Sequence, residues 1–161
     1  MPDTQMKLTS LVYTDGGCYN NDKIDPIGYG SYKCYNIESF EYVPDHGYMA
    51  QCTPIFESMR FAMFTEYMTT NNLSEYIALL TTANMIKREG LVSNGNRVMI
   101  NMDSALIINQ FYGLFRCKDI ALLEVHEQIK QVMGLMNNPH RDKRLIINKI
   151  SGDNMKVVLG H

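Results

Sequence analysis

The sequence predicts one α/β domain, built on a mixed β-sheet that is flanked by helices. The predicted elements follow the order strands, helix, strand, helices, strand, helix. Strand–helix–strand stretches imply parallel pairing, whereas the consecutive early strands imply an antiparallel meander. The length of 161 residues suits a single domain, 1–161, that buries a core of its own.

The strands are predicted from runs of β-branched and aromatic residues. The first run covers residues 7–14, and we expect it to stop at a turn formed by Asp15-Gly16-Gly17. A second strand is expected at 29–36. Residues 37–68 are hard to assign and contain strand-like pieces at 40–43 and 61–68, separated by Pro44, Gly47 and Pro54. Two further apolar runs predict strands at 98–102 and 145–150.

The helices are predicted from apolar residues at helical spacing. Residues 73–89 form the first helix, which Gly90 ends. Helices are also expected at 104–114 and 121–136, and a short one at 153–159. His126 falls inside the longest of them, where we expect a structural role.

Composition excludes several classes of protein. No apolar run approaches the roughly 18 residues of a membrane span, and no signal peptide is visible, so we expect no membrane partner. The four cysteines form no C-x-x-C pair, which argues against a zinc site and favours a reduced, cytoplasmic protein. The net charge of −2 argues mildly against strong nonspecific binding of nucleic acid. Nothing indicates an obligate protein partner.

Three carboxylates stand at the ends of predicted elements. Asp15 follows the first strand, Glu75 lies in the first turn of the first helix, and Asp103 follows the strand at 98–102. If the two strands are neighbours, Asp15 and Asp103 emerge at the same edge of the sheet. Like charges repel, so a converging set of carboxylates calls for a bound cation, and oxygen ligands suit Mg²⁺ or Mn²⁺.

Each carboxylate also has a purely structural explanation. An Asp before two glycines is a common turn residue. Asn72 is a candidate N-cap, which would make Glu75 part of a capping box. Asp103 or Ser104 is a candidate N-cap of the helix that follows. Spacing alone leaves both interpretations open.

Longer motifs resemble the ribonuclease H type 1 family. The segment TTNNLSEYIALL, residues 69–80, resembles the family's T-N-N-x-A-E-Y-x-A-L. Residues 98–113, VMINMDSALIINQFYG, resemble its strand, Asp-Ser and L-V-V-x-Q with a following Gly. YTDGG at 13–17 with GYGSY at 28–32 resembles its first two strands. The match spans nearly the whole chain and is closest to the compact bacterial and archaeal-like branch, which lacks a large basic insertion.

The resemblance implies a five-stranded mixed sheet with helices on both sides. It also implies a metal-dependent endonuclease that hydrolyses the RNA strand of RNA–DNA hybrids. Asp15, Glu75 and Asp103 would be the catalytic, metal-binding carboxylates. They would hold two Mg²⁺ ions, with Mn²⁺ as an alternative, and such pairs lie about 4 Å apart and assist in-line phosphodiester hydrolysis.

The resemblance further implies a surface that binds the hybrid. Gly16, Gly17, Asn71, Asn72 and Gln110 would lie near it. Hybrids resembling A-form helices are recognised by shape and 2′-hydroxyl contacts, for which backbone amides and small polar side chains are suited. Readout of base sequence is not expected.

The C-terminal segment departs from the family pattern. A fourth acidic ligand is usual in the last helix, but residues 150–161 read ISGDNMKVVLGH. His161, which can ligate metal or carry a proton, and Asp153 are the candidates for this position. Asp153 is also a candidate N-cap. If neither residue serves, the chain is a nucleic-acid-binding module without turnover, and a related exonuclease or junction resolvase is a further alternative.

Overall fold

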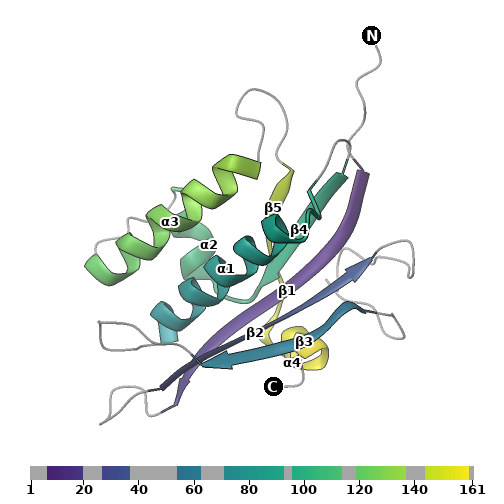
Figure 1. Cartoon of the computed structure of the whole chain (residues 1–161). Coiled ribbons are helices and arrows are strands. Elements are labelled where there is room, and N and C mark those ends of the chain that lie inside the picture. Colours follow the sequence, from purple (N-terminus) through teal and green to yellow (C-terminus); the bar gives the residue numbers. More distant parts are fainter. Residues whose placement is uncertain are drawn as a thin grey trace.

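The computed structural model describes residues 7–19, 27–36, 54–62, 71–92, 96–113, 119–136 and 144–159. Strands and helices alternate in the order expected from the sequence (Figure 1). The strands are β1 (Lys7–Tyr19), β2 (Ile27–Asn36), β3 (Pro54–Ala62), β4 (Asn96–Met102) and β5 (Leu145–Lys149). The helices are α1 (Asn71–Arg88), α2 (Ala105–Phe111), α3 (Ile120–Met136) and α4 (Gly152–Leu159).

The sheet is mixed, with the strand order β3-β2-β1-β4-β5. β1 pairs antiparallel with β2, and β2 pairs antiparallel with β3, which confirms the predicted meander. β4 lies parallel to β1 on its other side, and β5 lies parallel to β4. β1, which contains Asp15, and β4, which ends just before Asp103, are therefore neighbours that run in the same direction.

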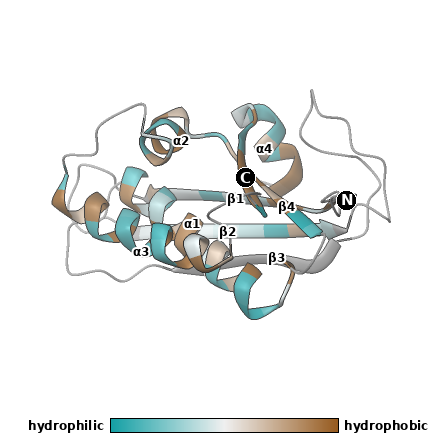
Figure 2. Cartoon of the chain, turned by 90° about the horizontal axis from the view of Figure 1, so that it is seen from above, coloured by the Kyte–Doolittle hydropathy of each residue, from teal (hydrophilic) through white to brown (hydrophobic). Residues whose placement is uncertain are grey.

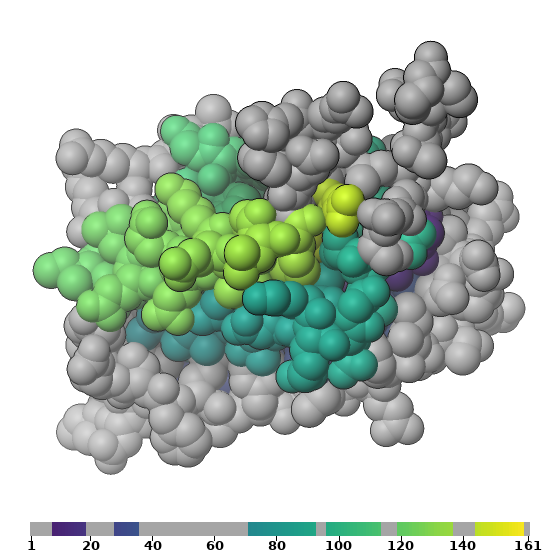
Figure 3. All heavy atoms as spheres, turned by 45° about the horizontal axis from the view of Figure 1, so that its top comes forward, coloured from purple at the N-terminus to yellow at the C-terminus, as the bar shows by residue number. Residues whose placement is uncertain are grey.

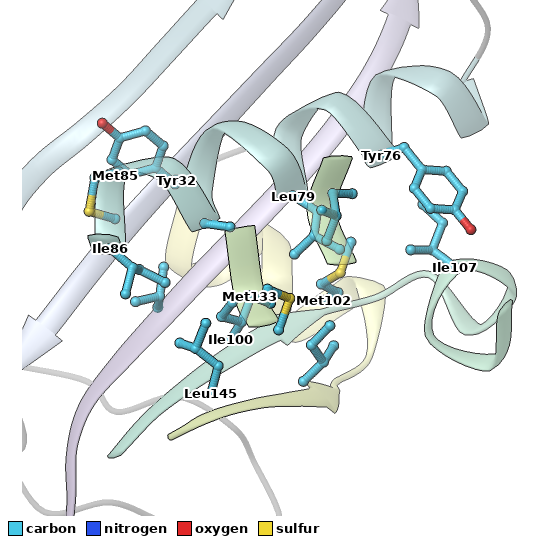
Figure 4. Close-up of a cluster of buried hydrophobic side chains, with 14 of the residues drawn as sticks. Tyr32, Tyr76, Leu79, Met85, Ile86, Ile100, Met102, Ile107, Met133 and Leu145 are labelled. Carbon is cyan, nitrogen blue, oxygen red and sulfur yellow. The ribbon is translucent and has the colours of Figure 1, made fainter. Parts of the chain in front are cut away.

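Helices cover both faces of the sheet. Side chains of α1, α2 and α3 pack with β1, β2, β4 and β5 in the larger core, part of which is drawn in Figure 4. α3 lies along α1 at the surface (Figure 3), and its mixture of polar and apolar residues is visible in Figure 2. α4 closes a second core on the opposite face, formed by Leu11, Tyr13, Tyr35, Ile150, Met155 and Leu159. No helix among the described residues has the length and apolar character needed to cross a membrane.

β1 is longer than predicted, because it does not stop at Asp15-Gly16-Gly17. These residues continue the ladder with β2, and Asp15 faces Ser31 in the register. The predicted turn is therefore wrong. Glycine at 16 and 17 reflects close packing, since a Cβ atom at Gly17 would collide with the ring of Tyr29.

The sequence predicts only the last two residues of β3 as strand. The strand begins at Pro54, which had been expected to interrupt a strand. Proline is tolerated here because it is the first residue of a strand at the end of the sheet. The expected strand at 61–68 coincides with β3 only at 61 and 62. The pieces at 40–43 and 63–68 lie outside the described residues.

The helix ends refine the predicted caps. α1 starts at Asn71, so Asn72 lies inside the helix and is not its N-cap. Glu75 therefore lies beyond the first turn, and the predicted capping box is wrong. Gly90 has a φ of 63° just after α1, as its predicted role requires. Ser104, rather than Asp103, caps α2, because its hydroxyl accepts a hydrogen bond from the Ile107 amide. α4 begins at Gly152, one residue before the predicted start, and its N-cap is Ser151, whose hydroxyl accepts a hydrogen bond from the Asn154 amide. Asp153 lies inside the helix, so its predicted role as the N-cap is wrong.

Tyr112 protects the last strand of the sheet. It follows α2, and its hydroxyl donates to the Ile147 carbonyl at 3.0 Å. The same oxygen accepts from the Ile147 amide at 3.1 Å. One side chain thus satisfies both backbone groups of this residue in β5, where an open strand edge would otherwise offer pairing sites.

We predict that Tyr112→Phe weakens this edge while keeping the ring contact with Phe111. The loss of two hydrogen bonds should lower the free energy of unfolding by about 1 kcal/mol, measured by urea denaturation. Light scattering should also detect more self-association at high protein concentration. Unchanged stability and association would show that water replaces the hydroxyl without cost.

Candidate metal centre

Asp15, Glu75 and Asp103 converge in the folded chain. One carboxylate oxygen of each lies within 4.8 Å of the others, and all three side chains are half-buried. The sheet explains the pairing of the two aspartates. In the parallel pairing of β1 with β4, Tyr13 is opposite Asn101. Two residues further along each segment, Asp15 and Asp103 are therefore adjacent.

Glu75 reaches this point because α1 lies directly against β1. A Cβ atom at Gly16 would lie 2.7 Å from the Glu75 amide nitrogen and still closer to the Ser74 carbonyl. Only glycine allows this approach without displacing a backbone. Further along the same contact, the Thr82 hydroxyl donates to Thr14 Oγ1 at 2.9 Å. The helix therefore has a fixed position beside the strand that carries Asp15.

Asp103 is placed by the end of β4 and by the start of α2. In β4, the buried Asn101 donates to the Val12 carbonyl at 3.4 Å and accepts from Asn148 at 3.0 Å. These bonds join β1, β4 and β5 two residues before Asp103. Because Ser104 serves as the N-cap, the Asp103 carboxylate is not used in capping.

The electrostatics of the cluster are unfavourable for three ionised groups. Burial, repulsion by Asp103 and a hydrogen bond with its carboxyl raise the pKa of Asp15 to about 7, although the Gly16 amide opposes the shift. Burial and repulsion by Asp103 and Asp15 raise the pKa of Glu75 to about 8, against a lowering effect of the Ser104 hydroxyl. Part of the cluster therefore holds protons near neutral pH in the absence of a cation.

The donor set fits a hard divalent cation. The cluster offers carboxylate oxygens, and its partial burial strengthens attraction to a positive charge. A cation would relieve the repulsion that, together with burial, raises both pKa values. The chemistry of these residues therefore matches Mg²⁺ or Mn²⁺ better than a thiol-seeking metal.

The residues expected to contact substrate differ in their exposure. Asn71 and Asn72 are exposed at the N-terminal end of α1, four and three residues before Glu75. Gly16 is partly exposed, whereas Gly17 is buried. Gln110 is 8% exposed, and its side-chain oxygen accepts a hydrogen bond from Tyr76.

Of the two candidates for a fourth site residue, Asp153 lies among the described residues. Asp153 is exposed in the first turn of α4 and is not part of the three-carboxylate group. Its neighbour Gly152 does approach the centre, since a Cβ atom there would be 3.5 Å from Asp103 Oδ2. His161 lies outside the described residues.

His126 packs near Tyr76, the residue after Glu75, and is not part of the carboxylate cluster. It is 5% exposed, and its ring centroid lies 5.8 Å from that of Tyr76 and 5.9 Å from that of Phe111. Within the described part of the chain, neither ring nitrogen has a hydrogen-bond partner. Burial and the charge of Lys130 lower its pKa, so the ring stays neutral and acts as a packing group.

The polar side chains that support the centre were missed by the sequence reasoning. Thr14, Thr82 and Asn101 are all buried. Each interrupts an otherwise apolar pattern in a strand or on a helix face. That interruption was the available signal, but it does not indicate which residues pair across the fold.

No protein-family model and no curated protein matches the sequence. Solved structures do match it. RNase H1 from the halophilic archaeon Halobacterium salinarum has a TM-score of 0.66 at 14% identity, covering 91% of this chain and 89% of that one. The N-terminal RNase H domain of a Mycobacterium tuberculosis protein gives 0.62 at 18%, covering 94% and 88%. LC11-RNase H1, solved in complex with an RNA/DNA hybrid, gives 0.62 at 21%, covering 89% and 86%.

These likenesses establish an α/β ribonuclease H-like fold over about nine-tenths of the chain. They confirm, at the level of the fold, the resemblance to type 1 ribonucleases H that the motifs indicated. The three carboxylates converge at one end of the two central parallel strands of this fold.

The raised pKa values predict that stability without divalent ions falls as the pH rises. Asp15 and Glu75 bind protons more tightly in the folded chain than in the unfolded chain, where their pKa values are near 4. Their protonation therefore favours folding at pH 4, and this contribution is lost as the pH rises to about 8. Thermal unfolding in EDTA should show the decline, and Mn²⁺ should reverse it by binding the ionised folded form.

Asp15→Asn removes one of the repelling charges. At pH 8 in EDTA it should raise the free energy of unfolding by about 1–3 kcal/mol. Glu127→Gln, which changes an exposed acid of α3, is the matched control and should have little effect. If the two variants behaved alike, the three carboxylates would not repel one another as described.

Gly16→Ala should disturb the centre by pushing α1 away from β1. The new methyl group overlaps the backbone at Ser74, so the free energy of unfolding should fall by about 1–3 kcal/mol, and Glu75 should move. Gly134→Ala is the control, since Gly134 lies in α3 with nothing within 4 Å of its added Cβ. That variant should be at least as stable as the parent, because alanine favours helix. Equal effects of both changes on urea denaturation would contradict the tight contact.

Proposed function

We propose that this protein is a metal-dependent endonuclease that hydrolyses the RNA strand of RNA–DNA hybrids. The observation that carries the proposal is the convergence of Asp15, Glu75 and Asp103 on a ribonuclease H-like fold. The similarity to LC11-RNase H1, which has been solved with an RNA/DNA hybrid, supports this choice of substrate.

In this proposal the three carboxylates hold the divalent ions. Asp15 comes from β1, Glu75 from α1 and Asp103 from the end of β4, so three separate elements fix the ligand positions. Bound Mg²⁺ or Mn²⁺, as two ions, would supply charge neutralisation and a stronger nucleophile for phosphodiester hydrolysis. The protein's own contribution is to keep the carboxylates close, partly shielded from water and ionised once the ions bind.

The exposed residues beside the centre are proposed to receive the hybrid. Asn71 and Asn72 present side-chain amides at the end of α1 that precedes Glu75. Amides both donate and accept hydrogen bonds, which suits 2′-hydroxyl groups in a wide minor groove. Gly16, which is partly exposed, would contribute through its backbone, without a side chain that blocks approach. Gly17 is buried and is not proposed to contact the hybrid. Recognition of this kind does not depend on base sequence.

Cleavage of an end-labelled RNA–DNA hybrid in Mg²⁺ or Mn²⁺ tests the function. The parent protein should cut internally in the RNA strand, whereas single-stranded RNA and double-stranded DNA should remain intact. Asp15→Asn, Glu75→Gln and Asp103→Asn should each reduce the rate by at least about 100-fold, since loss of groups that merely support metal ligands costs 10- to 100-fold. Glu127→Gln should cut like the parent.

The same assay decides between the alternatives. Metal-dependent cutting only from RNA or DNA ends would favour an exonuclease, and cutting of branched DNA alone would favour a junction resolvase. Binding of the hybrid by a folded protein without cleavage in either metal would favour a binding module. His161→Ala and Asp153→Asn, compared in the active protein, would show which of them completes the site.

A further inference from the structure

Two buried polar side chains join the helices that lie next to the candidate metal centre. The Tyr76 hydroxyl of α1 donates to Gln110 Oε1 of α2 at 2.5 Å. Tyr76 is fully buried, and Gln110 is 8% exposed. A hydrogen bond in such surroundings is directional and costly to leave unmade, so it restrains the distance and angle between its two helices.

Both residues lie close in the sequence to a carboxylate of the cluster. Tyr76 directly follows Glu75. Gln110 is in α2, a helix of seven residues whose N-cap, Ser104, directly follows Asp103. In Figure 4, the Tyr76 side chain points from α1 toward Ile107, a residue of α2. A shift of α2 relative to α1 would therefore change the separation of Glu75 and Asp103.

The aromatic surroundings keep this bond in place. The His126 ring of α3 packs against the Tyr76 ring and also against the ring of Phe111, the residue after Gln110. Three helices thus meet at the Tyr76–Gln110 bond. Such convergence restricts the rotamers of both partners.

We propose that Tyr76 and Gln110 are positioning residues, which hold Glu75 and Asp103 at the separation that a divalent cation requires. The inference rests on the proposed function, in which these carboxylates are metal ligands. It gives Gln110 a role inside the protein, acting through Tyr76, instead of a direct contact with the nucleic acid. The relation resembles that of outer groups that orient metal ligands without touching the metal.

Titration calorimetry with MnCl₂ tests this inference without relying on catalysis. Tyr76→Phe and Gln110→Leu should each weaken Mn²⁺ binding by about tenfold. Ile129→Val is the control, because it trims a buried residue of α3 in the same core but leaves the hydrogen bond intact. It should bind Mn²⁺ like the parent protein.

The double variant Y76F/Q110L separates positioning from a general effect on stability. Removing both partners leaves neither member of this hydrogen bond buried without the other, so stability should recover toward that of the parent. The restraint is still absent, so Mn²⁺ affinity should remain about tenfold low. Recovery of affinity together with stability, or equal affinities of the parent and both single variants, would overturn the inference.

The outcomes also distinguish this inference from the proposed function. If the parent protein binds Mn²⁺ but does not cleave the hybrid, the function fails, and the variants still decide the positioning role. Absence of Mn²⁺ binding by the folded parent would overturn the inference, because Glu75 and Asp103 would then not act as ligands of a cation.

Discussion

The candidate centre depends on one backbone contact, between Gly16 in β1 and Ser74 in α1. No side chain separates the strand from the helix there, because even a Cβ atom would overlap the Ser74 carbonyl. The contact places Glu75 beside Asp15, while the parallel pairing of β1 with β4 places Asp103 beside both. A glycine in the middle of a strand is thus a requirement of the site.

The site opposes the stability of the fold that builds it. Burial of the three carboxylates and their mutual repulsion raise the pKa values of Asp15 and Glu75 to about 7 and 8. Buried polar bonds elsewhere hold the elements together despite this repulsion, notably those of Thr82 with Thr14 and of Tyr76 with Gln110. Such an arrangement is typical of functional sites, where local stability is given up for binding or chemistry.

The fold class, the meander and the three carboxylates could be predicted because their signals are local or carried by long motifs. Residues 98–102 and 145–150 are apolar runs, and the helical spacing from 73 to 89 is clear. The continuation of β1 through Asp15-Gly16-Gly17 could not be predicted, because turn chemistry and tight packing both select glycine. Most of β3 could not be predicted either, because proline usually interrupts a strand. Pro54 is tolerated at the start of β3 because this strand lies at the edge of the sheet, which the sequence does not reveal. The Tyr76–Gln110 bond joins residues 34 apart, and no local pattern indicates such a pair.

The most direct test of the central claim, that Asp15, Glu75 and Asp103 form a metal centre, is anomalous X-ray diffraction from crystals soaked in MnCl₂. We expect an anomalous peak within bonding distance of all three carboxylates, close to the roughly 2.0–2.1 Å at which Mg²⁺ binds oxygen ligands. The peak should be absent from crystals of Asp15→Asn. A well-ordered structure with no peak there, or with Mn²⁺ bound only elsewhere, would contradict the account.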